Sequence, residues 1–126
     1  MQGHLVIIGG VAAGAKAAAK ARRQDANLKI SIFNEGEHIS YSACGLPYFI
    51  EDVIKDSKQL LVRSPEFFKT KANVDVYIKH KVIKISPESR TISVKNIETD
   101  DIFDVKYTKL LIATGAKPFI PEIQGV

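Results

Sequence analysis

The sequence predicts an α/β fold, in which helices cover a parallel sheet and an antiparallel β-meander adds a further layer. A continuous apolar run at residues 5–8 is followed at once by a glycine-rich turn and an alanine-rich segment. Short runs of alternating apolar residues fill much of the second half of the chain. With 126 residues, 45% of them hydrophobic, the chain is expected to form a single domain with an ordinary core.

Composition and charge exclude several classes of function. The net charge of +4 suits phosphate-bearing ligands, but it is too weak and scattered to indicate nucleic-acid binding. The one cysteine excludes an internal disulfide and favours a reducing, cytoplasmic location. No apolar run approaches the roughly 18 residues of a membrane span, and no secretory signal is visible. No cluster of His, Cys and Asp has the spacing of metal ligands, so we expect no metal.

The glycine-rich turn at residues 9–14 lies between the apolar run and a helix expected at residues 15–23, and a second strand is expected at residues 29–33. This order is that of a Rossmann-like dinucleotide-binding unit, in which the helix N-terminus directs N–H groups at a pyrophosphate. Gly14, Ala17 and Ala18 would let the helix pack close to the sheet. The alternative to a nucleotide-binding turn is a tight turn in some other kind of α/β protein. The candidate ligand contacts are Gly9, Gly10, Val11, Ala12, Ala13 and Gly14, with Val11 where the usual motif has its second glycine.

An acidic residue is expected at the end of the second strand, where it would bind the ribose hydroxyls of a dinucleotide. The candidates are Asn34 and Glu35. Period-two alternation directs Asn34 away from the core if Phe33 points into it. An Asn amide can also bind a hydroxyl, although without the help of a charge.

Cys44 is the candidate redox centre. Apolar residues spaced as on a short helix follow it, at Leu46, Tyr48, Phe49, Ile50 and Val53, and Pro47 suits a first helical turn. The thiol is therefore expected at or just before a helix start, where unpaired N–H groups favour a thiolate. A buried structural cysteine is the alternative.

Lys16, Lys20 and Arg23 form one basic stripe along the first helix. Either the stripe binds ligand phosphates near Cys44, or it is only the solvated face of the helix.

The rest of the chain supplies further elements. Ser64 and Pro65 predict a helix start, with Phe67 and Phe68 in the core. Residues 74–105 predict a meander of short strands, in which His80 is structural or solvated. Residues 107–113 predict another buried strand. It ends in Ala113, Thr114 and Gly115, a small turn that lets the backbone approach a ligand.

Together these residues resemble the N-terminal FAD-binding domain of the pyridine nucleotide-disulfide oxidoreductases. The matching blocks are residues 6–14, 40–48 and 110–115, and the Cys-Gly-Leu-Pro-Tyr segment from Cys44 is most similar to the coenzyme A-disulfide reductases. That single-cysteine branch also includes NADH oxidases, NADH peroxidases and persulfide reductases. The resemblance covers essentially all of this chain, but only about the first quarter of such an enzyme.

The resemblance implies roles for individual residues. Residues 9–14 would hold the FAD pyrophosphate, Lys81 and Val82 would lie beside the adenine, and Thr114 and Gly115 would lie near the flavin. Asn34 stands where the family usually has the Glu that binds the ribose. Cys44 would cycle between a thiolate and a mixed disulfide with coenzyme A. Lys16, Lys20, Arg23 and Ser40 fall at positions that contact coenzyme A, and Ala43 replaces a frequent polar contact.

The implied activity is NAD(P)H-dependent reduction of coenzyme A disulfide or a persulfide, with FAD as the cofactor and a homodimer as the assembly. An NADH oxidase or peroxidase is the alternative within the family, and a nucleotide-binding module without redox chemistry is the alternative outside it. Residues 1–126 are expected to be one FAD-binding domain of a larger flavoenzyme, without its nicotinamide and dimerisation domains. Alone, the fragment is expected to bind FAD weakly or not at all, to be inactive, and to self-associate through an open sheet edge.

Overall fold

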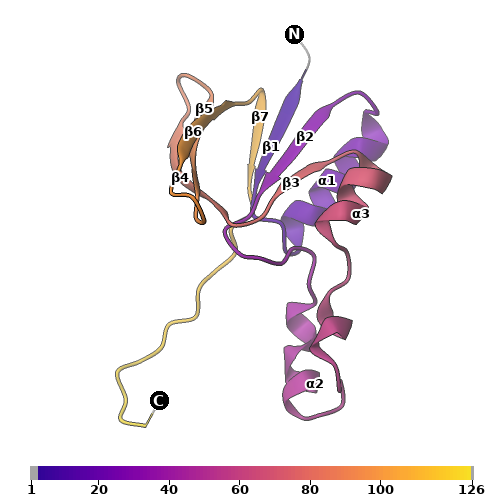
Figure 1. Ribbon diagram of the computed structural model, residues 1–126, viewed down its shortest axis with the longest axis vertical. Coiled ribbons are helices and arrows are strands. Elements are labelled where there is room, and N and C mark those ends of the chain that lie inside the picture. The colour runs from indigo at the N-terminus through magenta and orange to yellow at the C-terminus, as the bar shows by residue number, and fades with distance from the viewer. Residues whose placement is uncertain (1–2, 126) are drawn as a thin grey trace.

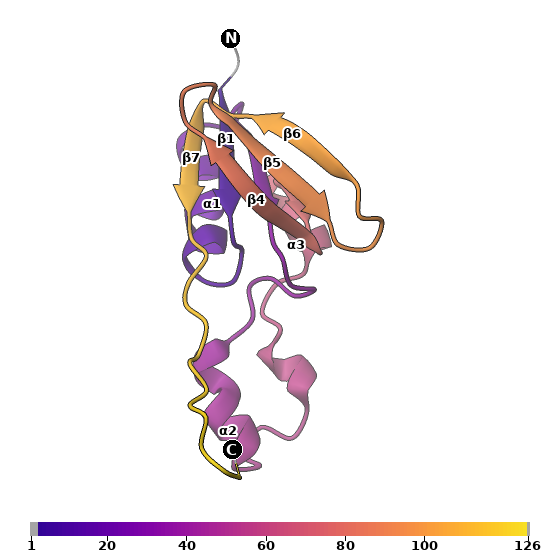
Figure 2. The same ribbon diagram turned by 90° about the vertical axis from the view of Figure 1, so that its left-hand side faces the viewer.

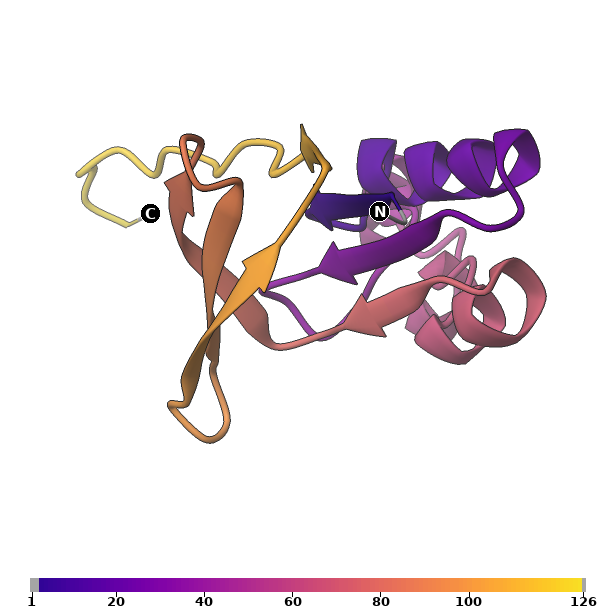
Figure 3. The ribbon, with the colours of Figure 1, turned by 90° about the horizontal axis from the view of Figure 1, so that it is seen from above.

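The computed structural model describes residues 3–125, and its two sheets and two of its helices form three layers (Figure 1). Strands β1 (His4–Ile8), β2 (Lys29–Phe33), β3 (Asp75–Tyr77) and β7 (Lys109–Ile112) form a parallel sheet in the order β3-β2-β1-β7. Helices α1 (Ala13–Gln24) and α3 (Pro65–Ala72) cover one face of this sheet. Strands β4 (His80–Ser86), β5 (Thr91–Asn96) and β6 (Ile102–Lys106) form an antiparallel sheet against the other face (Figure 3). The predicted α/β fold with a meander layer is confirmed.

The parallel sheet is buried on both faces because alternate side chains of β1 and β2 enter different cores. On the helix side, Ile7 packs in one cluster with Ala18 of α1 and Phe68 of α3. On the meander side, Val6 and Ile8 pack in a second cluster with Ile92 and Val94 of β5. This double burial explains the continuous apolar run at the start of the chain.

The segment 74–78 corrects one prediction. It was expected in the meander, but β3 pairs in parallel with β2, with Ser31 opposite Asp75 and Phe33 opposite Tyr77. Alternation of apolar residues has the same period in parallel and antiparallel strands, so the sequence pattern could not separate the two cases. Val74, which leads into β3, is fully buried in the helix-side core and ties this strand to the parallel sheet.

Strand β7 corrects a second prediction. It is shorter than the expected run and it is an edge strand, with Ile112 60% exposed. Within residues 3–125 no strand pairs with its outer edge. The chain then leaves the sheet as an extended segment (Figures 1 and 2).

Helix α3 begins where the sequence predicts. The hydroxyl of Ser64 accepts a hydrogen bond from the N–H of Phe67 at 3.2 Å, and Pro65 occupies the first turn. Phe68 is buried as expected, but Phe67 is 37% exposed, so its assignment to the core was wrong. The guanidinium of Arg63 stacks on Phe67, 4.4 Å from its ring centre.

An arm formed by residues 41–61 extends away from the three layers (Figure 2). It carries the 3₁₀ turns η1 (Ala43–Gly45) and η2 (Ser57–Leu60) on either side of helix α2 (Leu46–Ile50). The helix predicted after Cys44 is thus present, with Pro47 near its start, but none of its residues is buried. Of the helices described, none is long and apolar enough to cross a membrane.

His4 joins three strands at the start of β1. Its Nδ1 lies 2.9 Å from the Lys106 carbonyl oxygen, and its Nε2 lies 2.9 Å from the hydroxyl of the buried Ser31. A carbonyl only accepts, so Nδ1 carries the proton and Nε2 accepts from Ser31. Burial lowers the pKa of His4 below its ordinary value, and the positive charge of Lys29 lowers it further.

This lowered pKa predicts a pH-dependent stability. Folding favours the neutral imidazole, so the contribution of His4 is complete above the unfolded pKa and is lost as the pH falls toward the folded pKa. Urea unfolding at about pH 7.5 and about pH 5.5 should show a larger loss of stability in the wild-type chain than in His4→Gln. His38→Gln, at an exposed position, is the control and should lose as much as the wild type. An equal loss in His4→Gln would contradict the prediction.

Candidate functional site

The candidate site lies at the carboxyl edge of the parallel sheet, where the turn after β1 meets the turn after β7. Gly9 has φ +93°, and a Cβ at this position would lie 2.3 Å from the Ala113 carbonyl oxygen. The N–H of Ala113 donates to the Ile8 carbonyl at 2.8 Å, which holds the two turns together. Only glycine fits this position, because a side chain would clash with the neighbouring backbone.

Helix α1 approaches the same turn just as closely. A Cβ on Gly14 would lie 1.8 Å from the Gly9 carbonyl oxygen and 2.9 Å from the Ile7 side chain. Gly14, Ala15 and Ala18 are buried, whereas Ala17, which was expected to join them, is half-buried. Ala12 precedes the helix and provides no side-chain cap, so among residues 3–125 no side chain caps the first N–H groups of α1. A free helix N-terminus of this kind attracts an anion.

Asn34 anchors the turn from the end of β2. Its Oδ1 accepts a hydrogen bond from the N–H of Gly10 at 3.0 Å, and its Nδ2 donates to the carbonyls of Gly36 and His38 at 3.0 and 3.1 Å. The residue is only 5% exposed. The expectation that Asn34 points away from the core is therefore wrong, and these amide contacts are all to the protein backbone, while its contact with a ribose stays a prediction.

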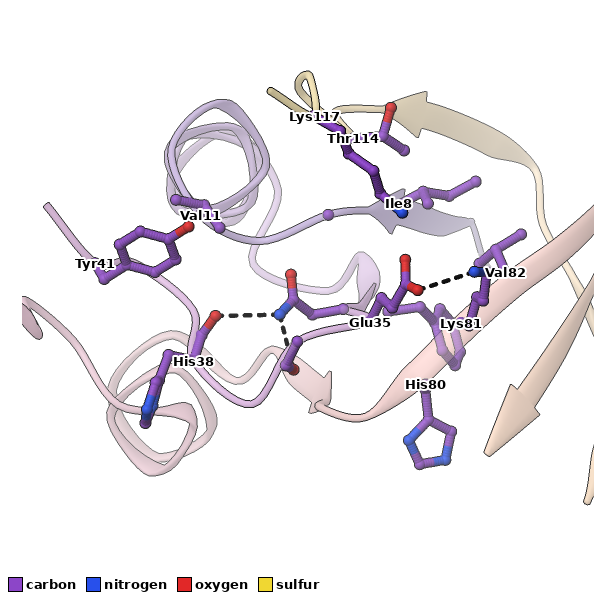
Figure 4. A pocket seen from close by; sticks show the side chains of 14 residues that line it. Ile8, Val11, Glu35, His38, Tyr41, His80, Lys81, Val82, Thr114 and Lys117 are labelled. Atoms are coloured by element: carbon purple, nitrogen blue, oxygen red, sulfur yellow. Dashed lines mark hydrogen bonds and ion pairs between the residues drawn. The ribbon is translucent and has the colours of Figure 1, made fainter. Parts of the chain in front are cut away.

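Glu35 is instead the carboxylate that faces solvent at this edge. Its Oε1 accepts a hydrogen bond from Lys81 of β4 at 2.9 Å (Figure 4). That bond lowers the pKa of Glu35 below its ordinary value, and the charge of Lys117 adds a smaller effect in the same direction. The carboxylate is therefore ionised at neutral pH.

These groups surround a cavity of about 470 Å³, called here the edge cavity. Gly9, Val11, Asn34, Glu35, Lys81 and Thr114 are among the residues that line it, and Figure 4 shows several of them. Val82 also lines it, so the cavity collects predicted residues from the glycine turn, from the segment after β2, from β4 and from the segment after β7. Gly115, which was expected beside them, has φ +67° and no atom within 4 Å of an added Cβ, and it does not line the cavity.

His80 has the structural role that the sequence predicted. Its Nδ1 lies 2.7 Å from the Ile78 carbonyl oxygen, and its ring contacts those of Tyr77 and Phe103 edge-on. No group of three or more His, Cys, Asp or Glu side chains within residues 3–125 is arranged to hold a metal ion.

A second cavity, of about 440 Å³, lies over helix α1 and is called here the helix cavity. Lys16, Ser40, Arg63 and Phe67 are among its lining residues. Val11 and Tyr41 line both cavities, so these two side chains form a shared wall. The structure thus brings Lys16 and Ser40 together as predicted. Lys20 and Arg23 do not line this cavity and lie exposed further along the helix.

Ser40 is held in an unusual conformation at the entrance to the arm. It has φ +50°, a left-handed value that costs a non-glycine residue about 1 kcal/mol. Its N–H donates to the Gly10 carbonyl at 2.9 Å, and its own carbonyl accepts from Val62 at 3.0 Å. These bonds fix the start of the arm to the glycine turn.

Cys44 lies in η1, directly before α2, and its side chain is exposed. This position matches the predicted helix start and excludes the alternative of a buried structural cysteine. Cys44 lines neither cavity, but Tyr41, three positions earlier, lines both. The Tyr41–Leu61 bridge and a 2.7 Å bond from the Ser42 N–H to the Leu60 carbonyl link this loop to the returning segment of the arm.

Sequence reasoning missed several residues of the site. Tyr41, His38 and Lys117 line the edge cavity, and Arg63 and Phe67 line the helix cavity. The aromatic and basic neighbours of Ser64 were a usable signal, because an Arg four positions before a Phe can stack on its ring across a helix start. The position of Lys117 follows only from the path of the chain after β7.

Asn34→Asp should destabilise the chain although the side chain keeps its shape. The carboxylate can still accept from Gly10, but it cannot donate to the Gly36 and His38 carbonyls. At this 5% exposed position the carboxylate would lie beside two carbonyl oxygens to which it cannot donate, which should lower the free energy of unfolding by about 2 kcal/mol, as measured by urea titration. Glu35→Gln, the exposed neighbour, is the control and should stay within about 0.5 kcal/mol of wild type. Equal stabilities of Asn34→Asp and wild type would refute this role.

Comparison with known proteins agrees with this geometry. The chain is 37% identical to a coenzyme A disulfide reductase of Staphylococcus haemolyticus over 89% of its own length and 26% of the relative's. It is 35% identical to an NADH oxidase of Methanocaldococcus jannaschii, over 95% of this chain and 27% of that protein. The chain therefore spans about a quarter of the curated relatives it matches.

Solved structures show the same fold. Reduced CoADR-RHD of Bacillus anthracis superposes with a TM-score of 0.93 at 38% identity, covering 98% of this chain and 22% of that one. An NAD-dependent persulfide reductase of A. fulgidus gives a TM-score of 0.91 at 33% identity, covering 97% of this chain and 23% of that one. The family model described as pyridine nucleotide-disulphide oxidoreductase matches residues 3–126. This chain belongs to the pyridine nucleotide-disulphide oxidoreductase family.

Proposed function

We propose that this chain is the FAD-binding part of an NAD(P)H-dependent flavoprotein that reduces coenzyme A disulfide or a persulfide through Cys44. The observation that carries the proposal is the exposed thiol of Cys44, three positions after Tyr41, which forms part of the wall between the two cavities. The relatives named coenzyme A disulfide reductase and persulfide reductase support this substrate class.

The residues of the edge cavity fit FAD. The bare backbone at Gly9 and Gly14 leaves room where side chains would clash, and the free N–H groups of α1 suit a pyrophosphate. Lys81 and Val82 would lie beside the adenine, and Glu35 is the accessible carboxylate for the ribose hydroxyls. Ala113, Thr114 and Gly115 would lie toward the flavin. When bound, FAD would supply the two electrons, derived from NADH or NADPH, that reduce the sulfur at Cys44.

The helix cavity fits the phosphates of coenzyme A. Lys16 and Arg63 place two cationic side chains on it, and Phe67 offers an aromatic face under the Arg63 guanidinium. Lys20 and Arg23 continue the positive charge along the exposed side of α1 and would attract the substrate without contact. The thiolate of Cys44 would attack one sulfur of the disulfide, forming a mixed disulfide and releasing one coenzyme A thiolate.

A second candidate function is an NADH oxidase or peroxidase, which the 35% identical NADH oxidase relative favours. Oxygen or peroxide would then replace the disulfide, and Cys44 would be oxidised to a sulfenic acid by peroxide. A nucleotide-binding module without redox chemistry is a third reading, in which Cys44 would have no role.

We also propose that the chain acts as one domain of a longer flavoenzyme, as in the relatives of which it spans about a quarter. The longer protein would be a cytoplasmic homodimer and would supply the nicotinamide-binding part. A strand from that protein would suit the open edge of β7.

The proposal predicts thiol–disulfide exchange by the chain itself, because this step requires no flavin. Incubation of the reduced chain with coenzyme A disulfide should give one mixed disulfide per chain, located at Cys44 by mass spectrometry, with one equivalent of thiol released. Cys44→Ser should form none. If the chain exchanges with coenzyme A disulfide no faster than a short cysteine-containing peptide does, the reductase function is contradicted. Rapid sulfenic acid formation with peroxide alone would favour the peroxidase.

The helix cavity predicts which cations assist this exchange. Lys16→Gln and Arg63→Gln should each slow exchange with coenzyme A disulfide about fivefold, the effect of losing ~1 kcal/mol of an exposed charge–phosphate contact. Lys20→Gln is the matched control on the same helix, because Lys20 lies outside the cavity, and it should change the rate less. With hydroxyethyl disulfide, which has no phosphates, all these variants should match wild type. A uniform loss with both disulfides would show a structural defect instead.

A further inference from the structure

Ser42 lies beside the sulfur of Cys44. Its hydroxyl oxygen is 3.5 Å from the Cys44 Sγ, at hydrogen-bond distance for a sulfur partner. Both side chains belong to the same tight turn, with Ser42 as the residue that precedes η1. No Lys, Arg or His side chain within residues 3–125 hydrogen-bonds to this sulfur, so Ser42 is the side-chain partner that the fold provides.

The hydroxyl of Ser42 does not cap the 3₁₀ turn that follows it. A serine before a helix commonly accepts a bond from a backbone N–H two or three residues later. Ser42 makes no such cap, and among residues 3–125 the Cys44 sulfur is the one hydrogen-bond partner of its hydroxyl. Its proton is therefore free to be donated to a thiolate.

The fold confines this hydroxyl near the sulfur. The Ser42 N–H donates to the Leu60 carbonyl at 2.7 Å, and the Ser42 carbonyl accepts from the N–H of Gly45 at 3.1 Å. A Cβ on Gly45 would lie 3.1 Å from the Ser42 hydroxyl oxygen and 2.8 Å from the Leu60 side chain. The absence of a side chain at Gly45 thus leaves the space that the hydroxyl occupies.

We propose that Ser42 is a positioning residue for Cys44: the Ser42 hydroxyl donates a hydrogen bond to the thiolate and so stabilises and orients it. This role rests on the proposed function of Cys44 as the redox centre. A hydrogen bond to the charged form of an acid stabilises that form, and the fold holds this donor 3.5 Å from the sulfur. The bond also orients Sγ, because Ser42 is fixed through its own backbone.

The test is the pH dependence of Cys44 alkylation by iodoacetamide in the purified chain, since only the thiolate reacts. In Ser42→Ala the pH at which the rate reaches half its plateau should rise by about half a unit to one unit, with a similar plateau. Ser42→Thr keeps a hydroxyl and should stay close to wild type. Ser57→Ala, an exposed serine of the same arm, is the control and should not shift the profile. Circular dichroism and urea unfolding establish that each variant is folded.

Equal half-plateau pH values for wild type and Ser42→Ala would overturn the proposal, as would an equal shift in Ser57→Ala. Exchange with coenzyme A disulfide is measured on the same samples. A wild-type chain that alkylates but does not exchange would refute the proposed function and leave the Ser42 result standing. If the chain exchanges with coenzyme A disulfide but Ser42→Ala leaves the alkylation profile unchanged, the proposed function stands and the role of Ser42 is refuted.

Discussion

The structure depends on a close contact between backbone segments at Gly9 and Gly14, where the lack of a side chain lets the segments approach. At Gly9 and Gly14 the turn after β1, the start of α1 and the turn after β7 approach to distances at which a Cβ would overlap a carbonyl oxygen. This approach places the N-terminus of α1 against the carboxyl ends of β1 and β7. It also sets Val11, between the two glycines, as part of the wall that separates the edge cavity from the helix cavity. Both cavities therefore follow from one glycine-dependent packing arrangement.

Asn34 connects the glycine turn to the segment after β2, which lines the edge cavity. Because its amide bonds link Gly10 to the backbone at Gly36 and His38, the chain after β2 turns back toward the glycine turn. Glu35 is consequently the accessible acidic group, and Lys81 of the meander pairs with it. The meander thus contributes a charge to the cavity as well as covering the sheet. An amide suits the inner position better than a carboxylate would, since it must donate to two carbonyls while it accepts from an N–H.

Local patterns determined how much of this could be predicted from the sequence. The apolar run of β1, the alanines of α1 and the Ser-Pro start of α3 each depend on neighbours in sequence, and their elements formed within a few residues of the predicted bounds. The parallel pairing of β3 and the edge position of β7 depend on partners far along the chain, which alternation does not identify. The buried role of Asn34 and the stacking of Arg63 on Phe67 likewise became visible only when distant backbones were in place.

The position of Cys44 is determined by the start of the arm more than by the arm's own helix. Helix α2 buries none of its residues, and Ile50 is 82% exposed. In the part of the chain that the structure describes, the packing of α2 therefore does not fix the position of the thiol. The backbone bonds at Ser40 and Ser42 do so instead, because they join the loop to Gly10 and to Leu60. The strained left-handed backbone at Ser40 is maintained by bonds to both sides, which is the condition under which such strain persists. The loop that carries Cys44 is thus connected directly to the glycine turn, and a change in that turn should reach the thiol through these backbone hydrogen bonds rather than through the core.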